Sequence, residues 1–211
     1  MARTITIKTF TDKNDFSCNV YICSSEKGSF IVDLGYFDSE IENYLKTIPP
    51  VKFVIQTHGH YDHIMGLNAF SEKYPGVEYY CHKDEIEVIM DFSKNCSPMA
   101  GILYCPWMCF KTLDAGIVDL FGYKIKVIHT PGHTMGSCMF YLEEENCVFT
   151  GDTLIENSIG RTDLPTGDES AIFRSLNKIK AMTFPEDTDF FFGHGSSLTY
   201  RELMKNNSFL R

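Results

Sequence analysis

The chain has 211 residues, of which 44% are hydrophobic and 22% charged, as in an ordinary soluble globular protein. A chain of this length buries roughly 70% of its unfolded surface on folding, which excludes disorder as its main state. Its 19 Lys and Arg against 28 Asp and Glu give a net charge of −9 with no basic run, which excludes nucleic-acid binding through a broad basic face.

The first half of the chain is predicted to combine strands and helices. Residues 4–10 alternate between polar and apolar side chains, which is typical of a strand and not of a secretion signal. The further strands are short runs rich in β-branched or aromatic residues, expected at 19–24, 29–33, 51–56 and 77–81. The helices have apolar residues at helical spacing and are expected between Asp38 and Pro49, at 64–74 and at 84–92.

The second half repeats this order of elements with a different sequence. Strands are expected at 116–120, 123–129, 137–142, 147–150 and 188–192, and helices at 169–182 and 200–205. No linker separates the halves, so one domain over residues 1–211 is predicted. Two strand-rich halves, each with helices, predict an α+β fold in which two sheets pack face to face with helices outside.

The length of the apolar stretches and the number of cysteines indicate the compartment in which the protein is expected. Every apolar stretch is far shorter than the roughly 18 residues that a membrane-spanning helix requires. Eight cysteines fall well below the density of a disulfide scaffold, and without an export signal they are expected to be reduced thiols. We therefore expect a cytoplasmic protein with no membrane partner and no nucleic-acid partner.

Three of the seven histidines lie in one short loop, Thr-His-Gly-His-Tyr-Asp-His, at residues 57–63. The loop follows the apolar strand predicted at 51–56, so the strand holds its backbone while successive side chains turn into a cleft. Imidazole and carboxylate groups suit zinc, iron or manganese. Four candidate ligands in this loop are enough for two ions, because one tetrahedral ion rarely accepts so many neighbours: His58, His60, Asp62 and His63.

Three later strand ends carry a single candidate ligand each. His133 lies in Thr-Pro-Gly-His-Thr, Asp152 in Thr-Gly-Asp-Thr and His194 in Gly-His-Gly. In each case a strand is followed by a tight glycine turn and then by one His or Asp. Four strand ends that present metal ligands together predict a metal centre.

This set of residues resembles the metallo-β-lactamase superfamily over nearly the whole chain. The family pattern is Thr-His-x-His-x-Asp-His followed by a lone His, a lone Asp and a final His, and it is complete here. The resemblance implies a four-layer αβ/βα sandwich. It also implies two metal sites, one formed by His58, His60 and His133, the other by Asp62, His63 and His194, with Asp152 as a bridge between the ions.

Within the superfamily, the motifs at 151–154 and 158–165 resemble the glyoxalase II branch, the hydroxyacylglutathione hydrolases. The residues from 193 to 210 resemble its short bacterial members, which are expected to lack the helical C-terminal domain that helps longer members bind glutathione. The resemblance implies hydrolysis of a small-molecule thioester, such as S-lactoylglutathione or a related acyl thioester. These motifs leave the acyl group and the thiol open.

The expected cofactor is a pair of divalent ions, most simply Zn²⁺, with iron or manganese as alternatives for the same ligands. Two ions about 3.5–4 Å apart can share a hydroxide, since a metal lowers the pKa of bound water to about 7. That hydroxide would attack the carbonyl carbon, and Asp62 is the expected catalytic residue because it could hold the second ion and orient the hydroxide. A thioester suits this chemistry because its thiol, with a pKa of about 8.5, leaves with little help from an acid.

Other activities occur on the same scaffold. A persulfide dioxygenase would hold one iron through His58, His133 and Asp152, whereas the complete ligand set favours two ions. A lactonase or another ester hydrolase is a further alternative. Metal content per chain and the reaction with oxygen distinguish these possibilities.

Several residues outside the ligand set are also candidates. Arg161 either captures a substrate carboxylate, as the candidate substrate-binding residue, or forms the favoured ion pair with Asp163. His82 is expected at the surface or as a helix cap, and His129 as a packed group behind the metal site. Residues 95–112, rich in Cys, Met and aromatic side chains, are predicted to form an apolar flap over the metal cleft, with a small satellite core as the alternative. No patch indicates an oligomeric state.

Overall fold

The computed structural model describes residues 4–11 and 18–211, and two six-stranded sheets dominate that part of the chain. The first sheet has the order β1-β2-β3-β4-β5-β6, with β1 at Thr6–Thr11, β2 at Asn19–Ser25, β3 at Gly28–Val32, β4 at Val51–Ile55, β5 at Glu78–His82 and β6 at Phe110–Leu113. The strands β3 to β6 run parallel to one another, so their carboxyl ends meet at one edge of the sheet.

The second sheet has the order β14-β13-β10-β9-β8-β7. Its strands are β7 at Gly116–Leu120, β8 at Tyr123–His129, β9 at Cys138–Leu142, β10 at Cys147–Gly151, β13 at Asp189–Phe192 and β14 at Leu198–Thr199. Only β10 and β13 are parallel in this sheet, and they carry the chain toward the same edge. A small hairpin, β11 at Leu154–Ile155 and β12 at Ser158–Ile159, follows β10.

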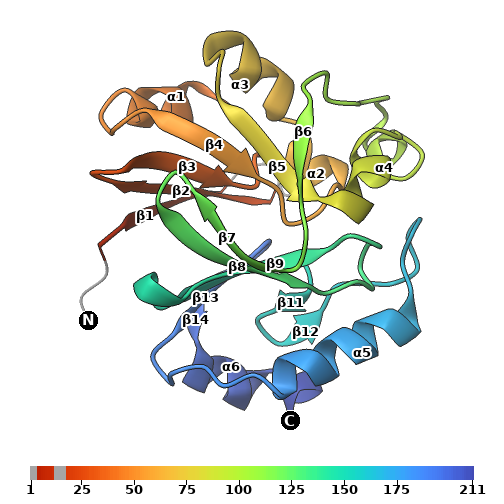
Figure 1. Cartoon of the computed structure of the whole chain (residues 1–211). Helices are drawn as coiled ribbons and strands as arrows, with labels where there is room; N and C mark the ends of the chain where they lie inside the picture. The colour runs from red at the N-terminus through yellow and green to blue at the C-terminus, as the bar shows by residue number, and fades with distance from the viewer. Residues whose placement is uncertain (1–3, 12–17) are drawn as a thin grey trace.

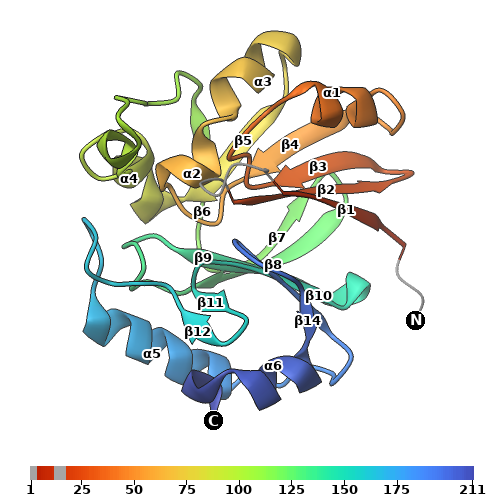
Figure 2. The same cartoon turned by 180° about the vertical axis from the view of Figure 1, so that it is seen from behind.

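The helices cover the outer faces of the two sheets (Figures 1 and 2). The helices on the first sheet are α1 at Ser39–Leu45, α2 at Tyr61–Ile64, α3 at Leu67–Lys73 and α4 at Ile86–Ile89. Those on the second sheet are α5 at Glu169–Lys180 and α6 at Tyr200–Asn206. The layers therefore follow the order helix, sheet, sheet, helix, and the predicted αβ/βα sandwich is confirmed.

Three hydrophobic clusters hold these layers together. One lies between the two sheets and includes Phe30, Phe53, Phe140 and Phe149. The second joins the first sheet to its helices, and the third joins the second sheet to α5 and α6. Because apolar side chains from both sheets meet in the central cluster, the carboxyl ends of β4, β10 and β13 are fixed relative to one another.

Helix caps follow the sequence signals closely. Asp38 accepts hydrogen bonds from the backbone N–H groups of Glu40 and Ile41, at 3.0 and 2.9 Å, and so begins α1 as predicted. Asp168 caps α5 in the same way, and α5 buries the apolar face formed by Ile172, Leu176 and Ile179. Capping and face burial together explain why these two helices form where the spacing predicts them.

Some predicted elements differ from the structure. The helix expected at 64–74 is interrupted at Gly66, whose N–H donates to the carbonyl of Leu34 at 2.9 Å. The helix expected at 84–92 is shorter, with a 3-10 turn η1 at Lys83–Glu85 before α4. The strand β6 begins inside the segment 95–112, where no strand was predicted, ends at Leu113 and pairs with β5.

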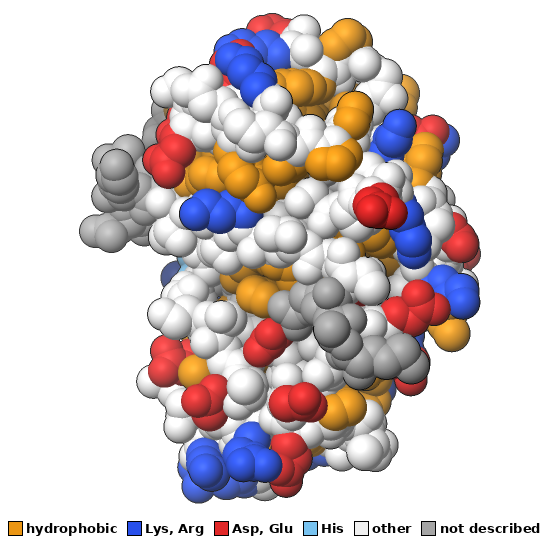
Figure 3. Space-filling view, turned by 90° about the vertical axis from the view of Figure 1, so that its left-hand side faces the viewer, with side chains coloured by type: hydrophobic (Ala, Val, Ile, Leu, Met, Phe, Trp, Pro, Cys, Tyr) orange, Lys and Arg blue, Asp and Glu red, His pale blue; other side chains and the backbone are white. Residues whose placement is uncertain are grey.

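The distribution of charged residues on the surface and the length of the helices agree with what the composition predicts. Figure 3 shows the face on the left-hand side of Figure 1, where Lys and Arg lie in separate groups with acidic side chains among them. Among the described residues, every helix is too short or too polar to cross a bilayer. The four cysteines predicted to lie in the core are buried: Cys18, Cys23, Cys138 and Cys147.

Candidate metal centre

The loop after β4 brings His58 and His60 to the edge of the first sheet. Its start is held by the buried Asp33, whose carboxylate accepts hydrogen bonds from the backbone N–H and the hydroxyl of Thr57, both at 2.7 Å. Asp33 has a φ of 52°, a left-handed conformation that Asp tolerates better than most residues. That turn ends β3 at Val32 and aims the carboxylate at the neighbouring loop.

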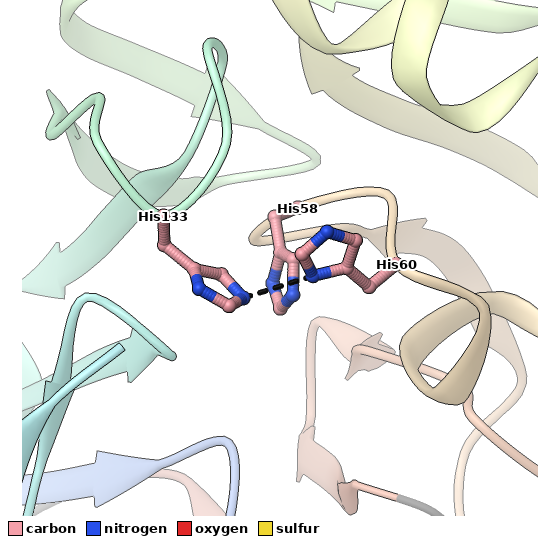
Figure 4. Close-up of side chains that lie close together, drawn as sticks. All are labelled: His58, His60 and His133. Carbon is pink, nitrogen blue, oxygen red and sulfur yellow. Dashed lines mark hydrogen bonds between the residues drawn. The ribbon is translucent and has the colours of Figure 1, made fainter. Parts of the chain in front are cut away.

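His58 and His60 converge with His133 from the loop after β8 (Figure 4). His60 Nδ1 and His133 Nε2 lie 2.9 Å apart, and one ligand atom from each of the three rings lies within 4.8 Å of the other two. The other nitrogen of His133, Nδ1, donates to the backbone carbonyl of Arg161 at 2.8 Å. This bond orients the ring and leaves the Nε2 lone pair free to bind a metal.

A second group of three residues, Asp62, His63 and His194, lies beside the first. His194 Nε2 is 3.2 Å from Asp62 Oδ2, and His63 Nε2 is 3.8 Å from the same oxygen. His63 Nδ1 donates to Asp33 Oδ2 at 2.9 Å, so the carboxylate that holds Thr57 also sets this ring. Asp33 thus connects the start of the loop to its last histidine.

Asp152, directly after β10, lies between the two groups. Its Oδ1 is 3.4 Å from His63 Nε2, and its Oδ2 is 3.6 Å from the Nε2 atoms of both His133 and His194. A Cβ on Gly193 would lie only 2.1 Å from Asp152 Oδ1, so glycine is required where β13 passes the carboxylate. The structure therefore brings together all seven residues that the sequence predicts as ligands.

The electrostatics of the site favour ligand forms of several side chains. Burial lowers the pKa of His60 to about 3 and also lowers that of His58, so both rings are neutral near pH 7. Burial alone would raise the pKa of Asp152, but the positive charge of the neighbouring His63 holds the pKa well below its usual range. Neutral imidazoles and an ionised carboxylate are the forms that bind divalent cations.

The residues fit a pair of divalent ions. Buried atoms without a hydrogen-bond partner among the described residues include Nε2 of His58, Nε2 of His63 and Oδ1 of Asp152. An unpaired buried polar atom costs about 1–3 kcal/mol, and coordination to a cation would remove that cost. Zinc, iron and manganese all accept this combination of imidazole and carboxylate.

A cavity of about 340 Å³ opens beside the two groups, with His60, Asp62, His133 and Asp152 in its wall. The remaining wall is mainly apolar and includes Cys96 and Met99 from the segment 95–112. The same segment packs Tyr104, Met108 and Phe110 against the cluster of the first sheet. One portion of the segment therefore lines the cavity, while another packs against the main core of the first sheet and does not form a separate satellite core. A flap over the cavity stays a prediction.

The other candidate residues lie as follows. Arg161 lines the cavity and forms the favoured ion pair, with Nε and Nη2 at 2.7 and 2.6 Å from the two oxygens of Asp163. His82 is buried and not at the surface, and it acts as the expected cap by accepting from the N–H of Asp84. His129 stacks on His82 with ring centroids 4.0 Å apart, outside the two ligand groups. Substrate binding by Arg161 stays a prediction.

Sequence reasoning missed two buried carboxylates that support the ligand loops. Asp33 is one, and its position just after a strand end is the signal that could have revealed it. Glu85 is the other: it accepts from the N–H of Gly59 at 2.7 Å and from the hydroxyl of Thr134 at 2.8 Å. Burial raises the pKa of Glu85 to about 7 although these bonds lower it. Glu85 therefore ties the loop after β4 to the loop after β8, and nothing in its local sequence indicates this.

Comparisons with known proteins agree with this geometry. A family model described as "Metallo-beta-lactamase superfamily" matches residues 14–194. "Probable metallo-hydrolase YqgX" of Bacillus subtilis (strain 168) is 31% identical over 196 residues, which cover 91% of this chain and 92% of that protein. "Hydroxyacylglutathione hydrolase GloC" of Haemophilus influenzae is 29% identical over 197 residues, 90% of either chain.

Solved structures show the same fold. The crystal structure of the BLEG-1 B3 metallo-beta-lactamase has a TM-score of 0.87 at 28% identity, and the match covers 97% of this chain and 99% of that one. The structure of TTHA1623 in a di-iron-bound form has a TM-score of 0.80 at 27% identity with the same coverage. The latter shows that a protein of this architecture accommodates two metal ions.

Proposed function

The chain belongs to the metallo-beta-lactamase superfamily, and from that premise we propose that it is a dinuclear metal-dependent hydrolase. The bond it cleaves is a thioester, as in S-lactoylglutathione or a related acyl thioester. The observation that carries this proposal is the pair of three-residue ligand groups with Asp152 between them. One ion would need only one of these groups.

In this proposal His58, His60 and His133 hold the first ion, Asp62, His63 and His194 hold the second, and Asp152 bridges them. When bound, the two ions supply an activated water and polarise the carbonyl of the substrate. The protein keeps the ligands in place: Asp33 sets the ring of His63, and the Arg161 carbonyl sets the ring of His133. A fixed ligand geometry lowers the cost of reorganisation during the reaction.

Asp62 is the proposed catalytic residue. It lies in the cavity wall, and its Oδ2 is 3.2 Å from His194 Nε2. Burial would raise the pKa of Asp62, but the charge of His63 and a hydrogen bond from His194 lower it below the usual value. An ionised carboxylate at this position can orient a water molecule and accept its proton at Oδ.

The other titratable groups of the cavity support a thioester as substrate. Outside the ligand groups, the described lining residues that titrate are Tyr61, Cys96 and Arg161. Burial raises the pKa of both Tyr61 and Cys96, so neither donates a proton readily to a departing group. A thiolate, whose conjugate acid has a pKa of about 8.5, leaves without protonation, whereas an amine does not. The relative named as a hydroxyacylglutathione hydrolase is consistent with this substrate class.

The proposal is tested by metal content and by hydrolysis on the same preparation. Protein purified without added metal or a nickel column is expected to contain about two ions per chain by mass spectrometry. Release of thiol from S-lactoylglutathione and from S-acetyl-N-acetylcysteamine is then followed with a thiol reagent. A single iron per chain, with oxygen consumed in the presence of glutathione persulfide, would overturn the hydrolase in favour of a dioxygenase.

A further inference from the structure

Part of the cavity wall beside the ligand groups is apolar, and this part is called the apolar side here. Met99 comes from the 3-10 turn η2 at Ser97–Ala100, while Ile155, Ile159 and Leu164 come from the hairpin β11–β12 and the loop after it. Two separate segments therefore supply the same kind of surface. Pockets lined in this way bind the apolar part of a ligand and use a few polar groups for orientation.

This apolar side begins directly at the ligand groups. A Cβ on Gly160 would lie 2.3 Å from the carbonyl oxygen of Asp152 and 2.8 Å from His133 Nδ1, so the end of the hairpin touches both. Ile159 precedes that contact and lines the cavity. When the carbonyl carbon of a substrate lies at the ligand groups, the acyl chain bonded to that carbon would therefore contact the apolar side directly.

The cavity offers little to an anionic group. Among the described residues that line it, Arg161 is the only Lys or Arg, and its Nε and Nη2 atoms donate to the two oxygens of Asp163. Asp62 and Asp152 lie in the same wall, and the whole chain carries a net charge of −9. The free carboxylates of a glutathionyl group find no unpaired Lys or Arg among these lining residues.

Further exposed apolar residues lie in the same segment as Met99, outside the set of residues that line the cavity. The side chain of Met99 is 65% exposed, and Leu103 and Trp107 are 73% and 64% exposed. The N–H of Tyr104 donates to Ser97 Oγ at 3.0 Å, which places this part of the segment beside η2.

We propose that the substrate is a thioester with an apolar acyl group of several carbons, which packs against Met99, Ile155 and Ile159. A short polar acyl group such as lactoyl leaves this surface exposed to water and is a poorer substrate. The inference rests on the proposed thioester hydrolysis and narrows its substrate class. Met99 is suited to the contact because its unbranched thioether adapts to different acyl shapes.

The test uses metal-replete full-length protein and thioesters of one thiol, N-acetylcysteamine, with acetyl, butanoyl, hexanoyl and octanoyl groups. The value of kcat/KM is expected to rise about threefold to fourfold for each added methylene until the cavity is filled. A second series keeps the hexanoyl group and exchanges N-acetylcysteamine for glutathione. Glutathione is expected to give no more than a twofold advantage.

Substitution of the apolar side supplies the specificity control. Met99→Gln keeps the length of the side chain, and Met99 is exposed enough that the core is unaffected. This variant is expected to lose about tenfold in kcat/KM for the hexanoyl thioester and less than twofold for the acetyl thioester. Met90→Gln is the matched control, since Met90 is 46% exposed and does not line the cavity, and it should change neither value.

The outcomes separate the inference from the function on which it rests. If the metal-replete protein hydrolyses no thioester, the proposed function fails and the inference fails with it. If all acyl lengths are hydrolysed within twofold, or S-lactoylglutathione is preferred to the hexanoyl thioester of glutathione, the hydrolase stands and the apolar acyl group is wrong. An equal loss for acetyl and hexanoyl thioesters in Met99→Gln would likewise overturn the role of Met99.

Discussion

Asp33 is a single carboxylate that serves two elements of the site. It accepts two hydrogen bonds from Thr57 and one from His63, and it is fully enclosed by the protein. The residues that bind directly to a metal depend on such supporting partners for their orientation. We therefore expect substitution of Asp33 to change both the metal affinity and the stability of the fold.

Asp33→Ala is predicted to leave the Thr57 donors and His63 Nδ1 without their acceptor. The free energy of unfolding of the metal-free protein should fall by about 1–3 kcal/mol. Affinity for zinc, measured by competition with a chromophoric chelator, should fall about 10–100-fold. Asp33→Asn retains one acceptor and the tolerance of a positive φ, so it should recover part of both losses. Unchanged zinc affinity in Asp33→Ala would contradict the supporting role.

Glu85 makes stability depend on pH in a direction opposite to that of an ion-paired carboxylate, whose pKa is lowered on folding. Burial raises the pKa of Glu85 from the ordinary glutamate value of 4.5 to about 7, so the folded state holds more protons between these pH values. The contribution of Glu85 to the free energy of unfolding therefore falls as the pH rises from about 5 to about 7, by up to about 3 kcal/mol. The neighbouring Asp84 adds to the upward shift.

The measurement is urea unfolding of the metal-free protein from pH 5 to pH 8, for wild type and Glu85→Gln. The amide does not titrate, so the stability of wild type relative to the variant should decrease across this range. Glu87→Gln is the control, because Glu87 is exposed and paired with Lys94. A constant difference between wild type and Glu85→Gln at every pH would show that Glu85 does not titrate near 7.

At the scale of elements, the break between α2 and α3 positions the ligands. The N–H of Gly66 bonds to Leu34, and a Cβ at Gly66 would meet Tyr36 C at 2.6 Å and Leu34 O at 2.8 Å. The same approach lets the N–H of Leu34 bond to the carbonyl of His63 at 2.9 Å. The break is therefore enforced by the chain after β3 and not by local helix propensity.

Gly66→Ala is predicted to destabilise the protein although alanine favours helices. The backbone must shift to admit the Cβ, at a cost of about 1–3 kcal/mol or more. Urea unfolding of the metal-free protein measures this loss. Glu72→Ala, at an exposed position of α3, should change the free energy of unfolding by less than about 0.5 kcal/mol. If the Gly66→Ala protein were as stable as wild type, the backbone of Leu34 and Tyr36 would have room for a Cβ at Gly66.

The predictable elements are those whose signals are local. The cap at Asp38 involves only residues of α1, and the apolar face of α5 involves only residues of that helix. Both features were predicted. The break at Gly66 and the strand β6 depend on contacts with distant residues, with Leu34 in one case and β5 in the other. Local spacing carries no information about such contacts.

The same distinction holds for the site. The candidate ligands follow strand ends and glycine turns, so their residue types and spacing identified them before any geometry was known. Asp33 and Glu85 act across 24 to 49 residues of sequence, through bonds to Thr57 and Thr134. These contacts exist only in the folded protein, where the ligand loops lie side by side.

At the scale of the whole molecule, the ligand groups join the two sheets. His58 and His60 follow a strand of the first sheet, whereas His133, Asp152 and His194 follow strands of the second. A cation held between them would therefore act as a crosslink of the sandwich. A ligand that binds only the folded state stabilises it by about 4 kcal/mol at a concentration 1,000 times its dissociation constant.

Removal of metal is predicted to lower the thermal midpoint. Dialysis against a chelator, followed by calorimetry, should lower Tm by several degrees, because 1 kcal/mol corresponds to about 2–4 °C in a protein of this size. Two equivalents of zinc should restore it. His194→Ala, which removes a ligand of the proposed second site, should show a smaller difference between the metal-free and metal-replete forms. Equal midpoints with and without metal in wild type would exclude the crosslink.

The separation of the ligands along the chain has a consequence for biosynthesis. His58 lies in the first third of the sequence and His194 lies near its end, and each ligand group combines residues from earlier and later segments. A nascent chain on the ribosome holds its first histidines long before the last strand emerges, so it presents an incomplete chelate to the cell. Cations bound at that stage exchange readily, and tight capture waits until both sheets have closed. Metal occupancy in the finished protein would therefore report that synthesis and folding had run to completion.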